Sequence, residues 1–480
     1  MKKNITKNYI YNVMYQIMAL LTPLITTPYI SRVLAADGIG IYSYTGNVNA
    51  YFTFIAALGT AKYGIREIAY CGDDRKKRST TFWEIEFLSI ICVVVSLIIY
   101  FIFLVFQKEL VIYAILSINI FAVGLEISWL YQGVEDFGKI AFRNCAIKLL
   151  YVVYVFVFVK TRQDLNIYIL GLPLLTVLSN ASLWISLPKY VDNPNLSEIK
   201  PFSHLKGTLA LFIPTMAIQI YSALDVIMIK VLTSDYAQNG YYEQALKLTK
   251  MSLTLVTALS IVMMPRIANL YKNGDKEAVK QNMYKTYQFL WFLGIPLCTG
   301  LAGISSNVVP WFFGEGYNLV AVLLKVMSIL IIVMGLSTIT GSQYLVSINK
   351  SREYSISIIV GMVSNIVLNL IMIPFWGALG AAIASVCAES IITIVQFYYV
   401  RNDFNILHII KKSRHYLFSA VLMFAVLSLE NKFFVPSILN TMIMIFTGAF
   451  CYFLILTIFK DELLFGCIDK VLKSVKRGKS

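Results

Sequence analysis

Eight charged residues lie inside long apolar segments of this sequence, where their types and positions could do chemistry. A charge within a membrane-spanning helix is costly, so such a residue usually faces a cavity or a partner. Lys247 and Lys250 are three residues apart, so a helix would place them on one face, with Glu243 one turn earlier. Basic residues outnumber acidic ones, which favours an anionic, phosphorylated ligand. The eight are Glu126, Lys148, Asp225, Lys230, Lys247, Lys250, Lys325 and Glu389.

The three acids have two interpretations. Glu126, Asp225 and Glu389 are either neutral acids that pack between helices or sites for a coupling ion or proton. Asp225 and Lys230 are five residues apart, about 140° around a helix, so they should not pair with each other. The second interpretation would make the acids sites of ion or proton coupling, without specifying H⁺ or Na⁺.

Composition excludes a soluble enzyme. Of the 480 residues, 58% are hydrophobic and only 14% are charged, with a mean hydropathy of +0.70. Average soluble domains carry about 25% charged residues. The sequence contains no GxxxxGK[ST] loop and no CxxC pair, and its three His residues are far apart. We expect no metal, no cofactor and no catalytic site, and expect energy from an H⁺ or Na⁺ gradient, the membrane potential or substrate supply.

The elements that position these charges are apolar segments of about 20 residues, which qualify as membrane-spanning helices. We predict an all-α polytopic membrane protein with about fourteen spans; twelve is the alternative count, because the thirteenth span is short. The predicted spans are 8–30, 42–64, 82–106, 110–132, 140–160, 166–188, 207–230, 244–265, 287–309, 319–346, 355–375, 377–400, 415–430 and 436–459.

Positive charges orient these spans. With a cytoplasmic N-terminus, most of the 41 Lys and Arg residues fall in the tails and in the loops after even-numbered spans. The loops on the opposite side contain only Arg32, Lys108, Lys160, Arg162 and Lys432. This asymmetry is the positive-inside pattern and predicts that both termini are cytoplasmic. Most of the net charge of +15 is therefore an orientation signal rather than a nucleic-acid site.

An internal repeat relates the two halves. Arg32-Val33-Leu34, Asp37 and Gly40-Ile41-Tyr42 correspond to Lys230-Val231-Leu232, Asp235 and Gly240-Tyr241-Tyr242. Tyr42 and Arg66 are separated by the same 24 residues as Tyr242 and Arg266. Six spans separate the copies, so both have the same orientation, as in transporters built from two parallel bundles. We predict an N-lobe at 1–200, a C-lobe at 201–402, and two extra spans with a basic tail at 403–480.

The repeated bases have two interpretations as well. Arg32, Arg66 and Arg266 would add to a cationic cleft between the two lobes, which would work by alternating access. Alternatively, Arg66 and Arg266 anchor cytoplasmic helix ends, and Arg32 and Lys230 extend toward the outer interface.

Two segments resemble a known family. Thr27-Pro28-Tyr29-Ile30-Ser31-Arg32-Val33-Leu34, followed by Gly38-Ile39-Gly40-Ile41-Tyr42, is similar to the opening of bacterial polysaccharide repeat-unit flippases of the Wzx type. The segment from Asp225 to Lys230, then Gly240-Tyr241-Tyr242-Glu243-Gln244-Ala245-Leu246-Lys247-Leu248 and Met264-Pro265-Arg266-Ile267-Ala268, is similar as well. These flippases belong to the multidrug/oligosaccharidyl-lipid/polysaccharide (MOP) exporter superfamily.

The resemblance implies two six-helix lobes around a V-shaped cleft. It implies transport of a polyprenyl-diphosphate-linked oligosaccharide across the bacterial cytoplasmic membrane, for O-antigen or capsule synthesis. By this analogy Arg32, Lys230, Lys247 and Lys250, with Arg66 and Arg266, would meet the diphosphate. Expected partners are the lipid-linked substrate, membrane lipid, a polysaccharide polymerase and a chain-length regulator.

Two alternatives are weighed against it. A drug or metabolite antiporter of the same superfamily usually takes cationic substrates and would need an acid-lined pocket, whereas bases predominate here. A membrane-embedded polysaccharide polymerase would need a sizeable outside loop to carry catalytic groups, and the predicted outside loops are short.

Overall fold

The structure is a computed structural model that describes residues 5–194, 197, 199–466 and 469. The described part of the chain is helical nearly throughout and contains no β-strand. It divides into two compact units, residues 1–227 (unit 1) and 228–480 (unit 2). Each unit is described below by itself.

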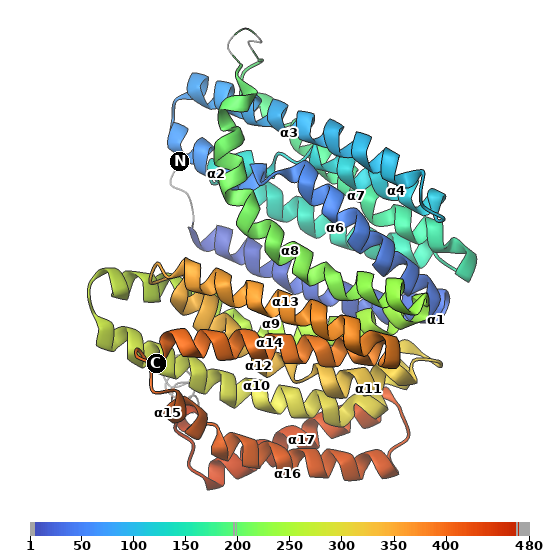
Figure 1. The fold of residues 1–480 in the computed structure, drawn as a ribbon, viewed down its shortest axis with the longest axis vertical. Helices are drawn as coiled ribbons and strands as arrows, with labels where there is room; N and C mark the ends of the chain where they lie inside the picture. Colours follow the sequence, from blue (N-terminus) through green and yellow to red (C-terminus); the bar gives the residue numbers. More distant parts are fainter. Residues whose placement is uncertain (1–4, 195–196, 198, 467–468, 470–480) are drawn as a thin grey trace, which may run out of the picture. The chain divides into compact units, whose positions relative to one another are not determined.

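Unit 1 is a bundle of helices joined by short turns (Figure 1). α1 packs on α3, α4 and α6, and α4 packs on α7. Its helices are α1 (Ile5–Ala57), α2 (Thr60–Cys71), α3 (Arg75–Leu104), α4 (Leu110–Val123), α5 (Ser128–Gly133), α6 (Phe137–Phe158), α7 (Leu165–Trp184) and most of α8 (Leu205–Thr233), with short 3₁₀ turns at Arg162–Asp164, Leu187–Lys189 and Pro201–His204.

A break divides α1 into two helical stretches. Ala35 has φ 54° and ψ −179°, values that no helical residue adopts. The first stretch contains the predicted span 8–30. The second contains only 42–57 of the predicted span 42–64, because a turn at Leu58 and Gly59 ends α1 and the remainder lies in α2. Past the end of α1, Gly59 has φ +71°, and a Cβ there would lie 3.1 Å from the Thr208 carbonyl oxygen. Glycine is required at this turn both for its backbone conformation and for the close approach of α8.

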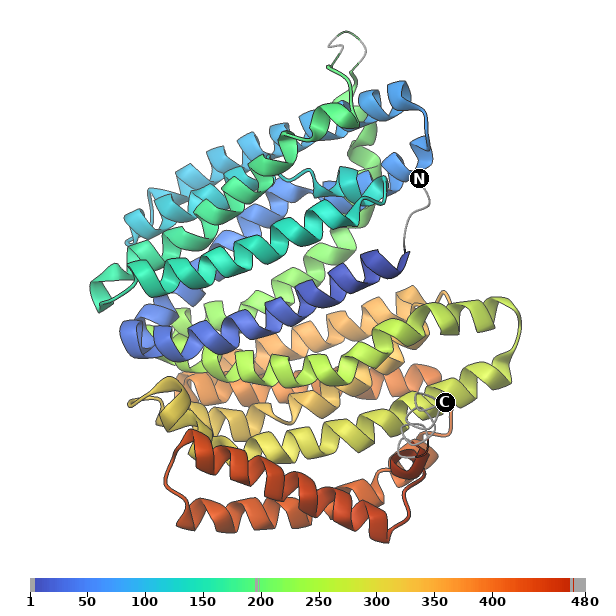
Figure 2. The same cartoon turned by 180° about the vertical axis from the view of Figure 1, so that it is seen from behind.

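Unit 2 contains the remaining helices (Figure 2). α9 packs on α10, α11 and α12, α13 packs on α14, and α16 and α17 form a pair beside α10. They are α9 (Tyr236–Lys272), α10 (Lys276–Phe313), α11 (Asn318–Met327), α12 (Leu330–Ser337), the π-helix η4 (Thr338–Leu345), α13 (Ser351–Trp376), α14 (Ala378–Val400), α15 (Ile406–Lys411), α16 (Arg414–Phe433) and α17 (Ile438–Ile458).

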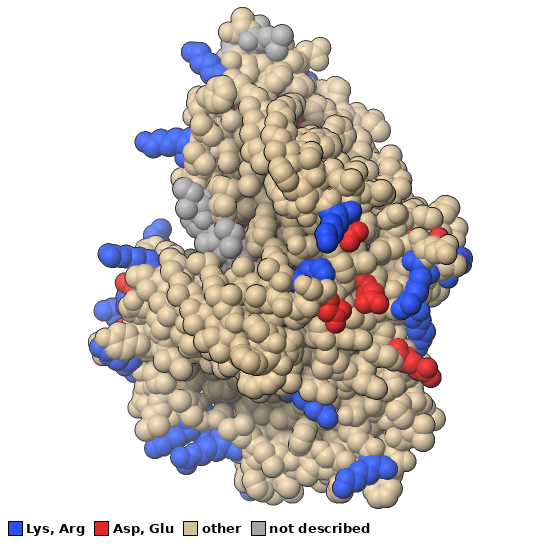
Figure 3. Space-filling view, turned by 45° about the vertical axis from the view of Figure 1, so that its right-hand side comes forward, with Lys and Arg blue, Asp and Glu red and all other residues tan. Residues whose placement is uncertain are grey.

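Eleven helical segments among the described residues are long and apolar enough to cross a membrane. They fall on predicted spans three to six and eight to fourteen. Predicted spans one, two and seven fall on α1, the start of α2 and α8, which are not among the eleven. Many apolar side chains point outward, among them Ile98 and Ile102 of α3 and Phe446 and Phe450 of α17. Figure 3 shows wide areas of the surface without charge. The predicted all-α polytopic membrane fold is confirmed, while the count of fourteen stays a prediction.

Each half of the repeat has a backbone break after its basic-Val-Leu signature. Ala35 with φ 54° follows Arg32 by three residues, and Ser234 with φ 59° follows Lys230 by four. Asp235 then begins α9 as its N-cap, where its carboxylate accepts a hydrogen bond from the Ala237 N–H. The basic-Val-Leu signature therefore precedes a turn between two helical stretches in each half. The two copies differ in length at this turn.

Candidate functional site

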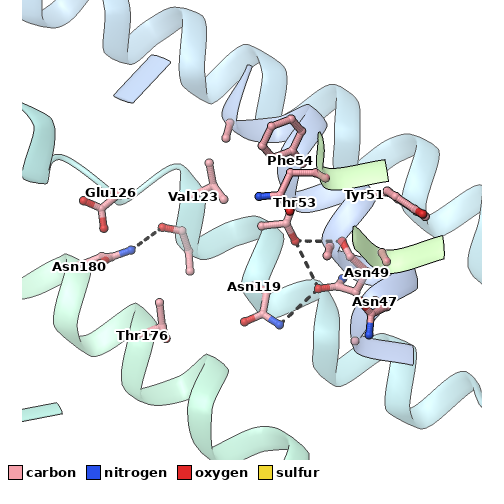
Figure 4. A pocket seen from close by; sticks show the side chains of 16 residues that line it. Asn47, Asn49, Tyr51, Thr53, Phe54, Asn119, Val123, Glu126, Thr176 and Asn180 are labelled. Carbon is pink, nitrogen blue, oxygen red and sulfur yellow. Dashed lines mark hydrogen bonds between the residues drawn. The ribbon is translucent and has the colours of Figure 1, made fainter. Parts of the chain in front are cut away.

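A cavity of about 520 Å³ lies within unit 1 (Figure 4). The second stretch of α1, α4 and the loop after it, α7 and α8 supply its walls. Uncharged polar side chains make up half of the lining residues, the rest are mostly small or apolar, and Glu126 is the one charged residue among the described residues that line it. We call it the amide pocket; its polar lining comprises Asn47, Asn49, Tyr51, Thr53, Asn119, Glu126, Thr176, Asn180 and Gln219.

Asn49 is the centre of a hydrogen-bond group in the amide pocket. Its side-chain oxygen accepts from Asn119 Nδ2 at 3.3 Å and from Thr53 Oγ1 at 3.3 Å (Figure 4). Its Nδ2 is buried and has no acceptor among the described residues. A buried amide donor without an acceptor is costly, so a ligand oxygen here would be stabilised. Amide groups that both donate and accept suit hydroxyl-rich ligands such as sugars.

Glu126 lies at the break between α4 and α5. Its Oε1 accepts a hydrogen bond of 2.8 Å from the Ser128 N–H, and its Oε2 lies 3.9 Å from Arg143 Nη1. Arg143 comes from α6 and also donates to Asn180 Oδ1 at 3.4 Å. Arg143 thus balances the charge of the Glu126 carboxylate, so the amide pocket has little net charge.

Glu86 is a buried acid that sequence reasoning missed. Its side chain on α3 is 1% exposed, and neither carboxyl oxygen has a hydrogen-bond partner among the described residues. The Glu126 carboxyl acts on it electrostatically. Burial without a partner strongly favours the neutral carboxylic acid. The sequence signal for Glu86 was its position inside the predicted span 82–106.

The structure places the predicted lysines of unit 2 on two helices. Lys230 lies on the last turn of α8, where its Nζ donates to the Ser234 carbonyl oxygen at 2.8 Å and sits 3.8 Å from the Tyr236 ring centroid. Lys247 and Lys250 lie on α9, about 16–21 Å along its axis from Tyr236. Lys247 is half-buried and Lys250 exposed, and neither ammonium group has a hydrogen bond or ion pair with the described residues.

The three predicted arginines are exposed. Arg32 donates to the Pro28 carbonyl oxygen at 3.2 Å within its own helix. Arg66 contacts Glu67 with Nε at 3.0 Å and Nη2 at 2.8 Å, and this hydrogen bonding raises the pKa of the Arg66 guanidinium. Arg266 follows Pro265 inside α9. Arg32 and Arg66 belong to unit 1 and Arg266 to unit 2, so their meeting with the lysines at one cleft stays a prediction.

The other two predicted acids lie on different helices. Asp225 is half-buried on α8, and Glu389 on α14 is 7% exposed and acts electrostatically on Tyr354 of α13. Among the described residues, no group of three or more His, Cys, Asp or Glu side chains could hold a metal ion.

Solved structures with this fold are membrane transporters. Lipid II flippase MurJ in an inward closed conformation matches with a TM-score of 0.76 at 17% identity, covering 96% of this chain and all of that one. An inward-facing multidrug resistance MATE family transporter of the MOP superfamily matches with a TM-score of 0.65 at 15% identity, covering 82% and 96%. These likenesses show the fold.

Sequence relatives then define the family. The family model "Polysaccharide biosynthesis protein" matches residues 5–271, and the chain belongs to this family; the model "Lipid II flippase MurJ" matches residues 194–453. A relative from Escherichia coli (strain K12), named as an O-antigen transporter, is 25% identical over 415 residues, 84% of this chain and 98% of the relative. Lipid II flippase MurJ of Bacillus subtilis (strain 168) is 26% identical over 216 residues, 42% of this chain and 40% of the relative. The resemblance to Wzx-type flippases of the MOP superfamily is confirmed.

Proposed function

We propose that this chain carries polyprenyl-diphosphate-linked oligosaccharide repeat units across the bacterial cytoplasmic membrane by alternating access, for O-antigen or capsule synthesis. The observation that carries the proposal is the family match over residues 5–271, which includes both copies of the basic-Val-Leu signature. The MurJ-like fold supports the same class of substrate. The chain acts as a transporter rather than as an enzyme.

The amide pocket and the bases would contact different parts of the substrate. The amide pocket offers uncharged donors and acceptors, which suit the hydroxyl groups of a glycan. The ammonium groups of Lys247 and Lys250 make no ion pair with the described residues, although the Glu243 carboxylate acts electrostatically on Lys247. A diphosphate would therefore contact Lys250 directly and compete with Glu243 for Lys247. Arg32, Arg66, Arg266 and Lys230 would add positive charge, although Arg66 must first leave Glu67. The lipid tail would stay in the bilayer.

The amide pocket disfavours the antiporter alternative. A cationic drug needs a free carboxylate, and the one acid among the described lining residues, Glu126, already lies 3.9 Å from Arg143. An ion pair of this kind leaves little potential for a second cation.

We further propose that ion coupling uses acids of the separate units, where transport depends on H⁺ or Na⁺ or on the membrane potential. In unit 1, the Glu126 carboxyl acts electrostatically on the buried Glu86. Asp225 on α8 is half-buried, and Glu389 on α14 is buried. A buried carboxyl can exchange a proton without large movement of the backbone, which suits a coupling role.

The proposed setting follows from the charge pattern. Both termini lie in the cytoplasm, and the basic loops face it. A polymerase and a chain-length regulator that receive the flipped repeat unit are the proposed partners on the outer side. Topology reporters placed in 232–243 and 430–436 should both report the outside; a cytoplasmic signal at the second would reduce the number of spans.

Gene deletion tests the transport function. Without this protein, surface polysaccharide should stop while loaded lipid carrier accumulates facing the cytoplasm. Normal export in the deletion strain would refute the proposal.

Charge removal tests the diphosphate contact. The double variant Lys247→Gln/Lys250→Gln should lower export at unchanged protein level, because each charge-assisted contact contributes about 1.5–3 kcal/mol. Lys272→Gln is the matched control, since Lys272 lies on the last turn of the same helix. Export at the wild-type level in the double variant would remove both lysines from this role.

A further inference from the structure

A second cavity lies in unit 2, where the short helix α15 packs on the first turns of α10. Its volume is about 260 Å³, and we call it the α10–α15 cavity. Three side chains that carry or can carry positive charge, Lys285, His408 and Lys412, line it together with the amides of Gln281 and Gln288. It belongs neither to the amide pocket nor to the bases of α9.

Hydrogen bonds hold both walls of this cavity in place. Trp291 Nε1 of α10 donates to the Ile409 carbonyl oxygen at 3.1 Å, and Ile409 is 1% exposed. The backbone N–H of Asn405 donates to the Tyr284 hydroxyl at 3.1 Å, and the Tyr284 ring meets His408 edge-on at 5.3 Å. The Tyr284 hydroxyl therefore accepts from the backbone and keeps its own proton for a ligand.

The positive charge of the cavity is not balanced from within. Among the described residues that line it there is no acid, and Lys285 makes no ion pair within this part of the chain. Lys412 lies 4.0 Å from Glu462, whose side chain is 84% exposed, so this pair contributes little.

The buried acid Asp461, which contacts Tyr416 behind Gln288, has its own donors. Its Oδ2 accepts from Tyr416 Oη at 2.7 Å and from His415 Nε2 at 2.9 Å, and its Oδ1 accepts from the Leu464 N–H at 2.9 Å. Gln288 bonds the same Tyr416 hydroxyl at 3.4 Å. Asp461 is thus satisfied behind the wall and leaves the cavity cationic.

The surroundings of the cavity indicate a membrane interface. On α15, Leu407 and Ile410 are 61% and 50% exposed, while Lys411 follows them directly. Exposed apolar side chains beside lysines are typical of a segment at the boundary between headgroups and acyl chains. This segment begins the candidate span Ile406–Phe433, which places the cavity at the end of a membrane helix.

We propose that the α10–α15 cavity binds the phosphate of an anionic phospholipid headgroup. Lys285 and Lys412 supply the charge, and Gln281, Gln288 and the Tyr284 hydroxyl supply neutral hydrogen bonds. Ligand pockets for whole small molecules usually measure about 300–1,000 Å³. The smaller cavity here has room for a headgroup phosphate, and it shares no lining residue with the amide pocket.

The test uses the full chain purified in detergent, with unfolding followed by temperature. Phosphatidylglycerol should raise the unfolding temperature and phosphatidylcholine should not, since ligands that bind the folded state stabilise it. The double variant Lys285→Gln/Lys412→Gln should bind phosphatidylglycerol at least about tenfold more weakly, because two charge-assisted contacts are lost. The control variant Lys272→Gln/Lys276→Gln removes two exposed lysines outside the lining and should bind as the wild type does.

Three outcomes would overturn the proposal. Equal stabilisation by phosphatidylcholine would show that headgroup charge does not matter. Equal stabilisation by inorganic phosphate at the same concentration would assign the site to a free anion rather than to a lipid. An unchanged affinity in the Lys285/Lys412 variant would place lipid binding elsewhere. If that variant does not fold, native mass spectrometry of the single variant Lys285→Gln replaces it, with fewer retained phosphatidylglycerol molecules than Lys276→Gln as the expected result.

Discussion

The contact between α13 and α14 predicts a strong effect of one methyl group. A Cβ at Gly380 would lie 2.4 Å from the carbonyl oxygen of Met372, 2.6 Å from its carbonyl carbon and 2.9 Å from the nitrogen of Ile373. All three atoms belong to the backbone of α13, so no side-chain rotation relieves the clash. Ordinary contact begins near 3.4 Å, so α14 must move by about 1 Å at this point.

The expected cost follows from two opposing effects. Overpacking of a tight interior costs about 1–3 kcal/mol of unfolding free energy. Because the clash is with backbone, we expect Gly380→Ala to cost about 3 kcal/mol. Alanine regains about 1 kcal/mol through its better helix propensity. The free energy of unfolding should therefore fall by about 2 kcal/mol, which corresponds to a decrease of roughly 4–8 °C in the unfolding temperature.

Thermal unfolding of purified protein in detergent measures this effect. Gly300→Ala is the matched control, because Gly300 also lies in a helix of unit 2 and a Cβ there meets only the Met423 side chain, at 3.7 Å. The control should unfold at the wild-type temperature or up to a few degrees higher. If Gly380→Ala proves as stable as Gly300→Ala, the close approach of α13 and α14 is wrong.

Three further predictions concern buried polar groups. Glu86→Gln should unfold at the wild-type temperature, because burial favours the neutral acid, but should lose stimulation of transport by a proton gradient; transport with unaltered dependence on the gradient would exclude Glu86 from coupling. Tyr190→Phe should cost about 1–2 kcal/mol, because the hydroxyl donates to Asp136 Oδ2 at 2.6 Å and accepts from Lys139 at 3.2 Å. Burial and the Asp136 carboxylate raise the pKa of the Tyr190 hydroxyl, so the folded state holds its proton more tightly. The loss of unfolding free energy in Tyr190→Phe should therefore be constant from about pH 6 to 9, below the ordinary tyrosine pKa. A loss that varies within this range would contradict the assignment. Asp461→Ala should lower the unfolding free energy by about 3 kcal/mol, since His415, Tyr416 and Leu464 all lose their acceptor, and a change under about 0.5 kcal/mol would refute that network.

Much of the fold could be predicted from the sequence because hydropathy is a local property. The apolar segments 82–106, 355–375 and 436–459 each coincide with a long helix, α3, α13 and α17. The repeat could also be predicted from the sequence, and in the structure Arg32 and Lys230 each precede a turn with positive φ. The family also followed from these letters and was confirmed by the match over 5–271.

The cavities could not be predicted in the same way. Asn49, Asn119 and Asn180 are far apart in the sequence and each looks like an ordinary polar residue of a membrane helix. They meet because α1, α4 and α7 turn those faces toward one volume. The same holds for Lys285 and Lys412, which look like two separate orientation signals until α15 packs on α10.

The sequence by itself thus determined the membrane class, the approximate spans, the repeat and the family, because each depends on windows of residues that are neighbours in the chain. The tertiary structure alone decided that Glu86 is buried near Glu126, that Arg143 balances Glu126, and which lysines share a cavity. These properties depend on the rotation of each helix about its axis and on its packing against partners distant in sequence. No local sequence pattern specifies that rotation for polar residues. A single polar side chain in an apolar helix does not indicate whether it points to lipid, to another helix or to a cavity.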